Sequence, residues 1–155
     1  MLKIEERNND QRLEIHLIGN LDESAESALA DFLKVFSKPE ILFNCREILQ
    51  INSIGVRIWI EFLKKFSVTT KVSVSECSGV FMDYRTLIPA MTLNTDILSV
   101  VVVFECRNCG TKIDKIIRKA EFNIDLDFGT LPCNKCSHAA KTNSNADDLF
   151  SFLEE

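Results

Sequence analysis

The chain has 155 residues, of which 46% are hydrophobic and 26% charged, with only five glycines and three prolines. This composition fits one globular domain of about 100 residues with an appendage, and it excludes a disordered or low-complexity chain, which would be poorer in apolar residues. The net charge of −5, with no strongly basic segment, disfavours nucleic acid as a partner.

The hydrophobic segments are too short for a membrane protein. The longest apolar run, over 97–104, is interrupted by Ser99 and falls well below the length that crosses a bilayer. The first ten residues are charged and lack the apolar segment of a secretion signal. We therefore expect a cytoplasmic protein with no membrane association, in which the six cysteines are metal ligands or buried apolar side chains rather than disulfides.

Strand-like and helix-like segments alternate over residues 1–103. A strand over 3–7 and a second over 13–18, ending at Gly19, predict a hairpin at the edge of a sheet. Asp22-Glu23-Ser24 is an acidic opening that suits the N-terminus of a helix over 25–36. The remaining segments are a strand over 41–43, a helix over 56–66, a strand over 68–74, a weaker helix over 80–91 that Pro89 disturbs, and a strand over 97–104. Strands separated by helices of about 10 to 15 residues are typical of βαβ units, so we predict an α/β domain over 1–103 with a mainly parallel sheet.

Residues 104–137 form a different unit, which lacks helical periodicity and carries a Cys-x-x-Cys pair near each end. Between the two pairs, apolar and polar residues alternate over 122–128, which predicts a strand. Residues 138–155 begin as a polar linker and end in a short apolar tail over 149–153. We expect this tail to dock back onto one of the folded parts.

The two cysteine pairs predict a metal site. The pairs are Cys106 with Cys109 and Cys133 with Cys136, with 23 residues between them. The two-residue gap lets both thiolates of a pair reach one ion at about 2.3 Å, and Gly110 suits the tight turn after the first pair. Because four thiolates complete a tetrahedral shell, we predict a zinc ribbon whose Zn ion is structural rather than catalytic. His138 in place of Cys136, and a redox switch that releases zinc on thiol oxidation, are the alternatives.

No catalytic motif stands out in the sequence. It contains no Ser/His/Asp set, HExxH, Walker loop or GxGxxG, and its only histidines are His16 and His138. Asp22 with Glu23 is interpreted as an acidic pair at a helix start. Cys45 and Cys77 lie outside the zinc pattern and are expected as buried packing residues. We therefore expect that the protein is not an enzyme.

The segment 52–57, Asn-Ser-Ile-Gly-Val-Arg, opens the helix that carries Trp59. Ser53 is expected to cap this helix, its hydroxyl accepting a hydrogen bond from a first-turn N–H. A phosphate on Ser53 would lie at the positive end of the helix dipole, with Arg57 one turn along. From the residues alone, a simple helix cap and a recognition surface both remain open.

The order of segments over 1–103, with Asn52-Ser53-Ile54-Gly55-Val56 opening the second helix, resembles the STAS domain of bacterial anti-sigma factor antagonists. That family has an Asp-Ser-Ser/Thr-Gly motif at this place, and its first serine is the phosphoacceptor for a partner anti-sigma kinase. The resemblance implies that Ser53 is a phosphoacceptor and Gly55 the motif glycine. Asn52 replaces the aspartate and Ile54 the second hydroxyl residue. The chain is also similar to bacterial proteins in which a STAS-like domain precedes a two-knuckle zinc ribbon.

The resemblance implies a cytoplasmic bacterial regulatory protein in signal transduction. It would dock a protein partner, such as an anti-sigma factor or a sensor kinase, through Asn52, Ser53, Ile54, Gly55 and Arg57. The alternative is a zinc-ribbon protein that binds nucleic acid or belongs to transcription. Residues 104–137 carry six basic and five acidic residues, so the electrostatic drive toward nucleic acid is small. That alternative needs a basic stripe built from Lys112, Lys115, Arg118 and Lys119. A small ligand bound in the sheet, the third reading, has no support in the sequence.

Overall fold

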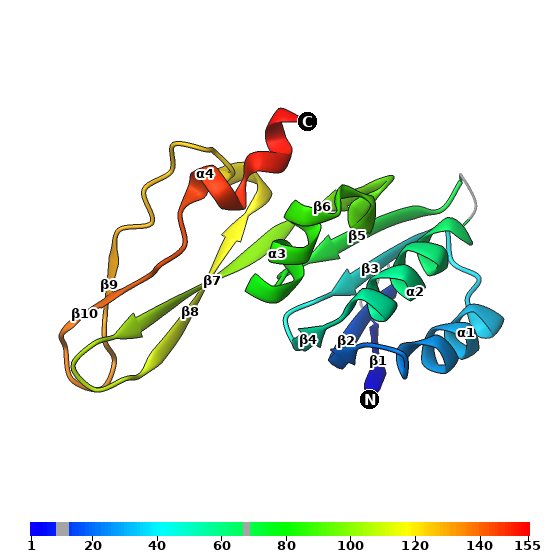
Figure 1. The fold of residues 1–155 in the computed structure, drawn as a ribbon, viewed down its shortest axis with the longest axis horizontal. Helices are drawn as coiled ribbons and strands as arrows, with labels where there is room; N and C mark the ends of the chain where they lie inside the picture. Colours follow the sequence, from blue (N-terminus) through cyan, green and yellow to red (C-terminus); the bar gives the residue numbers. More distant parts are fainter. Residues whose placement is uncertain (9–12, 67–68) are drawn as a thin grey trace.

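The computed structural model describes residues 1–8, 13–66 and 69–155, and within them the chain forms two sheets (Figure 1). The first sheet carries the helices α1 to α3, and the second extends away from it as a long arm. Ion pairs join the parts: among them, Arg46 Nη2 lies 3.1 Å from Asp114 Oδ2, and Lys119 Nζ lies 2.7 Å from Asp96 Oδ1.

The first sheet has six strands in the order β1-β2-β3-β5-β6, with β4 paired to β2 beyond the end of β3. β1 runs antiparallel to β2, which confirms the hairpin, and all the other pairings are parallel. The expected α/β fold with a mainly parallel sheet is therefore confirmed. Its elements are β1 (Leu2–Asn8), β2 (Leu13–Leu21), α1 (Ala25–Val35), β3 (Glu40–Asn44), β4 (Ile48–Ile51), α2 (Ser53–Lys64), β5 (Lys71–Ser75), α3 (Gly79–Leu87), the 3-10 helix η1 (Pro89–Thr92) and β6 (Thr95–Ile97).

An aromatic cluster forms the core between the sheet and the helices. Phe43 on β3 packs edge-on against Trp59 and Phe62 of α2, with ring centroids 5.3 and 5.5 Å apart. Phe32 of α1 reaches the same cluster, 6.1 Å from Phe62. Phe32 and Trp59 belong to the apolar stripes that predict the two helices, so burying the stripes holds α1 and α2 against the sheet.

Several boundaries differ from those expected. The strand expected over 68–74 begins at Val68, which lies outside the described residues, and β5 starts at Lys71. Pro89 ends the third helix early, and the chain continues as η1. No strand was expected between the strand over 41–43 and the helix over 56–66, where the structure has β4. It is four residues long and exposes its two central residues, so its hydropathy pattern is weak.

The apolar run over 97–104 forms two strands in two different sheets. β6 ends at Ile97, and β7 (Ser99–Cys106) belongs to the second sheet. The N–H of Leu98, between them, donates to the Val74 carbonyl oxygen. A run of consecutive apolar residues has no periodicity to mark where pairing changes, so the expectation of a single strand was wrong.

The second sheet is antiparallel, in the order β8-β7-β10-β9. β7 and β8 pair over their full length, from Ser99 with Arg118 to Glu105 with Lys112. β10 pairs β7 on its other side, where Ala140 lies opposite Cys106. The remaining elements are β8 (Lys112–Arg118), the 3-10 helix η2 (Lys119–Glu121), β9 (Thr130–Pro132), β10 (Ala139–Lys141), α4 (Ala146–Leu149) and the 3-10 helix η3 (Ser151–Glu154).

Residues 122–128 alternate in polarity but form no strand, so that expectation was wrong. The segment instead turns, with the N–H of Leu126 donating to the Asn123 carbonyl oxygen at 3.1 Å. Its apolar side chains pack on the C-terminal tail: Phe122 stacks on the buried Phe150 at 4.8 Å, and Phe128 meets the same ring at 6.2 Å. The alternation thus reflects packing against the tail rather than strand pairing.

The C-terminal tail docks on the folded part of the chain, as expected, because Phe150 is completely buried. The stretch from 138 to 148, expected as a linker, contains β10 and α4, and their residues Ala140 and Ala146 are buried. Cys45 and Cys77 are both fully buried, which confirms them as packing residues.

Candidate functional site

The start of α2 is held by Asn52. Its Oδ1 accepts a hydrogen bond of 2.8 Å from the Gly55 N–H, and its carbonyl oxygen accepts one of 3.0 Å from the Val56 N–H. Its own N–H donates to the Leu21 carbonyl oxygen at the end of β2. Asn52 is therefore the N-cap, and the expectation that Ser53 caps the helix was wrong. Ser53 is the first helical residue, so its hydroxyl is not used as the cap.

Gly55 is buried where α2 crosses the end of β2. A Cβ atom at this position would lie 1.7 Å from the Leu21 carbonyl oxygen and 2.7 Å from the Asp22 nitrogen. Both atoms belong to the backbone and cannot rotate away. Only glycine therefore allows the helix start to approach β2 this closely, and its part in the segment is to position the neighbouring residues.

Four residues of the segment face outward, whereas Val56 is buried. Asn52, Ser53, Ile54 and Arg57 are all exposed, and Ile54 is 46% exposed. Leu49 of β4, 72% exposed, precedes the segment and adds a second apolar side chain that the sequence analysis did not single out. Leu49 lies between Ile48 and Ile51, which are both buried, so no sequence signal distinguishes it.

The loop before α1 adds negative charge beside this segment. The Asn52 side-chain amide donates to Glu23 Oε2 at 3.1 Å. In the same loop, the Ser24 hydroxyl and the Ser24 N–H both donate to the Asp22 carboxylate, which lowers the pKa of Asp22. A carboxylate that accepts two hydrogen bonds remains ionised to lower pH. The loop thus carries two acidic side chains, of which Glu23 contacts Asn52 at the start of α2.

The four cysteines of the two pairs come together at the tip of the arm, where their sulfur atoms all lie within 4.8 Å of one another. The Sγ atoms of Cys106 and Cys136 are 3.4 Å apart, and those of Cys109 and Cys133 are 3.5 Å apart. A tetrahedron of sulfurs about 2.3 Å from a central ion has edges of about 3.8 Å. The four cysteines can therefore hold one metal ion.

The two Cys-x-x-Cys turns have the same backbone hydrogen bonds. The N–H of Cys106 donates to the Thr111 carbonyl oxygen, and that of Cys133 donates to the His138 carbonyl oxygen. In the second bond of each turn, the N–H of Gly110 donates to the Cys106 carbonyl oxygen at 2.7 Å, and the N–H of Ser137 donates to the Cys133 carbonyl oxygen at 3.0 Å. Both donors have positive φ, 75° at Gly110 and 65° at Ser137. Ser137 thus adopts a left-handed conformation that glycine adopts in the first turn.

Hydrogen bonds to sulfur favour the thiolate form of Cys109 and Cys136. The Thr111 hydroxyl lies 3.1 Å from Cys109 Sγ and, with the Thr111 N–H, lowers the pKa of Cys109 to about 6. The His138 N–H lowers the pKa of Cys136 in the same way. The His138 ring is exposed, and its Nδ1 lies 3.2 Å from the Cys136 carbonyl oxygen. Burial and the hydrogen bond with Cys136 raise the pKa of Cys106 to about 11. The set of four sulfur ligands matches the ligand chemistry of zinc.

The basic residues of the arm do not form one stripe. Successive residues of β8 alternate between its two faces, so Lys112 and Arg118 share one face with Asp114 while Lys115 lies on the other. Lys119 is paired with Asp96. The basic surface needed for the nucleic-acid alternative is therefore divided.

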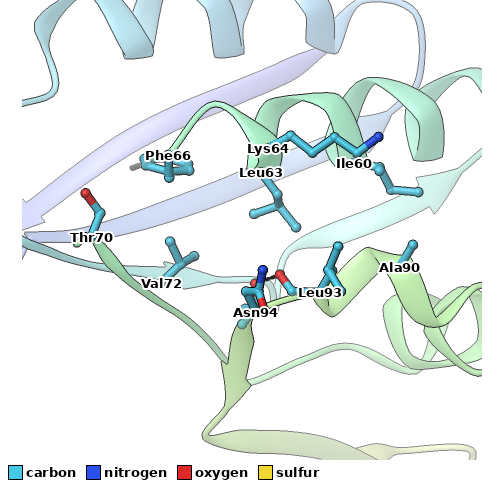
Figure 2. Close-up of a pocket in the computed structure, with 10 residues that line it drawn as sticks. Ile60, Leu63, Lys64, Phe66, Thr70, Val72, Ala90, Leu93 and Asn94 are labelled. Carbon is cyan, nitrogen blue, oxygen red and sulfur yellow. Dashed lines mark hydrogen bonds between the residues drawn. The ribbon is translucent and has the colours of Figure 1, made fainter. Parts of the chain in front are cut away.

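A cavity of about 500 Å³ lies elsewhere, between α2, the end of η1 and β5. Figure 2 shows Leu63 of α2 and Phe66, just after α2, facing Val72 and Leu93 across it, with Lys64 and Asn94 among the labelled polar residues. None of the cysteines or the residues 52–57 lines it.

Of the helices in the described parts of the chain, none has the length and apolar character needed to cross a membrane.

The solved structures similar to this chain include an anti-sigma factor antagonist from Mycobacterium paratuberculosis. The match has a TM-score of 0.51 at 14% sequence identity, and it covers 63% of this chain and 85% of that one. At this identity the likeness is one of fold, and it supports the expected STAS-like α/β fold. No protein-family model matches the sequence, and no curated protein matches it.

Proposed function

We propose that this chain is a cytoplasmic, non-enzymatic regulatory module of bacterial signal transduction, which docks a protein partner through the segment 52–57. The observation that carries the proposal is an exposed apolar side chain, Ile54, on a rigidly positioned helix start. The fold shared with an anti-sigma factor antagonist supports an anti-sigma factor or a sensor kinase as the partner.

The chemistry of the segment suits a small protein interface. Ile54 and Leu49 offer apolar area, and Arg57 offers a charged group that can form paired hydrogen bonds with a partner carboxylate. Because Asn52 and Gly55 hold the helix start against β2, the backbone that carries Ile54 and Arg57 loses little conformational freedom on binding. Arginine is also among the residue types enriched at binding hot spots.

Ser53 supplies a means of control in this proposal. Its hydroxyl is exposed and does not cap the helix, so a partner kinase can reach it without breaking the cap. A phosphate there adds close to two negative charges beside Glu23, which is already hydrogen-bonded to Asn52. The resulting repulsion would reorganise the helix start and release a partner that binds the unmodified form.

In the same proposal, the four cysteines bind a zinc ion with a structural role. Cys106, Cys109, Cys133 and Cys136 supply four sulfur ligands, so no coordination position is left for water or substrate. When bound, the ion would tie the two turns together and hold β10 against β7.

The test is affinity capture from native lysate, with the captured protein then purified and its affinity measured by calorimetry. Ser53→Asp and Arg57→Ala should each weaken binding, the latter about tenfold for one lost charge-assisted hydrogen bond. Arg7→Ala removes a half-exposed arginine on β1 and should leave the affinity unchanged. If the two segment variants retain the partner and Cys109→Ser loses it, the cysteine arm is the recognition element and the proposal is wrong.

A further inference from the structure

Arg85 of α3 is a buried arginine whose charge partner lies on the C-terminal tail. Its side chain is only 7% exposed, whereas that of Glu155 is 46% exposed. The Nη1 atom of Arg85 donates to Glu155 Oε1 at 2.8 Å, and Nη2 donates to Oε2, so the guanidinium binds the carboxylate with both arms. The third contact, from Nε to the Thr92 hydroxyl at 2.9 Å, holds the guanidinium in place.

Phe152 of the C-terminal tail packs against the same Arg85 guanidinium. The Phe152 ring lies 5.3 Å from the guanidinium carbon of Arg85 and meets Phe122 edge-on at 5.8 Å. Phe152 and Glu155 are three residues apart at the 3-10 turn η3, and residues i and i+3 of a 3-10 helix lie on one face. The aromatic ring and the carboxylate are therefore presented together.

Arg85, Thr92 and Phe122 form what we call the tail socket, and the tail does not fill it. A cavity of about 340 Å³ remains, and these residues line it together with Ile97, Phe152 and Leu153. Asp96 and Lys119 also line it, and the charge of Asp96 is paired with Lys119 at 2.7 Å. Leu153 is itself 46% exposed. A buried guanidinium requires an anion to offset its desolvation, but this anion need not come from the same chain.

We propose that the tail socket is a binding site for a partner peptide with an aromatic residue followed, three positions later, by a carboxylate, and that the chain's own tail occupies it in this structure. The bidentate contact selects the carboxylate, and the ring against Phe122 and Arg85 selects the aromatic residue. The socket shares no residue with the segment 52–57, so the inference is independent of the proposed function.

The test uses a tail-open variant, Phe152→Ala with Glu155→Gln, which keeps the buried anchor Phe150. The probe is a synthetic peptide of residues 151–155, acetylated and amidated so that only side-chain carboxylates are available. Binding is followed by NMR through the Arg85 Nε–H signal. We expect saturable binding with a Kd below about 1 mM in the tail-open variant, and at least about tenfold weaker binding in the wild type, where the tethered tail competes at high effective concentration.

Two sets of controls keep the result specific. Arg85→Gln in the tail-open variant should abolish binding, whereas Lys34→Gln, which removes an exposed cation on α1 that does not line the cavity, should change it less than about twofold. If Arg85→Gln does not fold, a probe carrying Glu155→Gln or Phe152→Ala makes the same test from the peptide side. Absence of saturable binding to the tail-open variant, equal binding to the wild type, or full binding of the substituted probes would each overturn the proposal.

Discussion

Gly55→Ala is the substitution that most directly tests how the helix start is positioned. The added Cβ would lie 1.7 Å from the Leu21 carbonyl oxygen and 2.2 Å from its carbonyl carbon. Since a normal contact between such atoms exceeds 3 Å, the start of α2 must move away from β2 by more than 1 Å. That movement also strains the Asn52 cap and the hydrogen bond from Asn52 to Leu21.

The expected loss is the sum of two effects. Overpacking against a fixed backbone costs about 1 to 3 kcal/mol, and a weakened N-cap costs about 1 kcal/mol more. We therefore expect the free energy of unfolding to fall by about 3 kcal/mol. For a chain of 155 residues this corresponds to a fall in Tm of about 10 °C.

The assay is urea unfolding followed by the fluorescence of Trp59, the only tryptophan, which is fully buried one turn after Gly55. Gly79→Ala is the matched control. Gly79 is also in the first turn of a helix, but a Cβ there would meet nothing within 4 Å, so this variant should be slightly stabilised. If Gly55→Ala unfolds within about 0.5 kcal/mol of the wild type, the close approach of α2 to β2 is not a constraint and the reasoning fails.

Four further predictions concern the arm. Purified protein should contain about one zinc per chain by metal analysis, and Cys109→Ser should lose it while the far-UV signal of the α/β domain is largely kept. In metal-free protein at pH 7, Cys109 should be the first thiol alkylated, because a pKa of about 6 leaves it mostly thiolate. Its rate should fall as the pH drops below 6, and the buried Cys45 should not react. Ser137→Gly should raise the stability of the metal-loaded arm by about 1 kcal/mol in thermal unfolding, since it relieves a left-handed non-glycine residue. Titration with duplex DNA at physiological salt should show no binding tighter than about 10⁻⁴ M, and submicromolar binding would restore the nucleic-acid alternative.

Helices and strands whose residues follow a short-range pattern could be predicted from the sequence alone. The apolar stripes of α1 and α2 and the alternation in β2 depend on residues three, four or two apart, so they predict the element without knowledge of its neighbours. The same holds for the four cysteines, because the two-residue gap within each pair is itself the geometry of a metal-binding turn. Docking of the tail followed from its apolar residues.

Tertiary structure alone decided which segments pair and which side chains are exposed. Residues 97–104 form strands of two sheets, and residues 122–128 form none, because a strand requires a partner that its own sequence does not specify. Asn52 rather than Ser53 became the cap because the end of β2 fixes where α2 begins. The contact of Arg85 with Glu155 joins residues 70 positions apart, and nothing local to either residue encodes it. The periodicity of a helix or strand can be seen in its own residues, whereas strand pairing and contacts between distant residues depend on the packing of the whole chain.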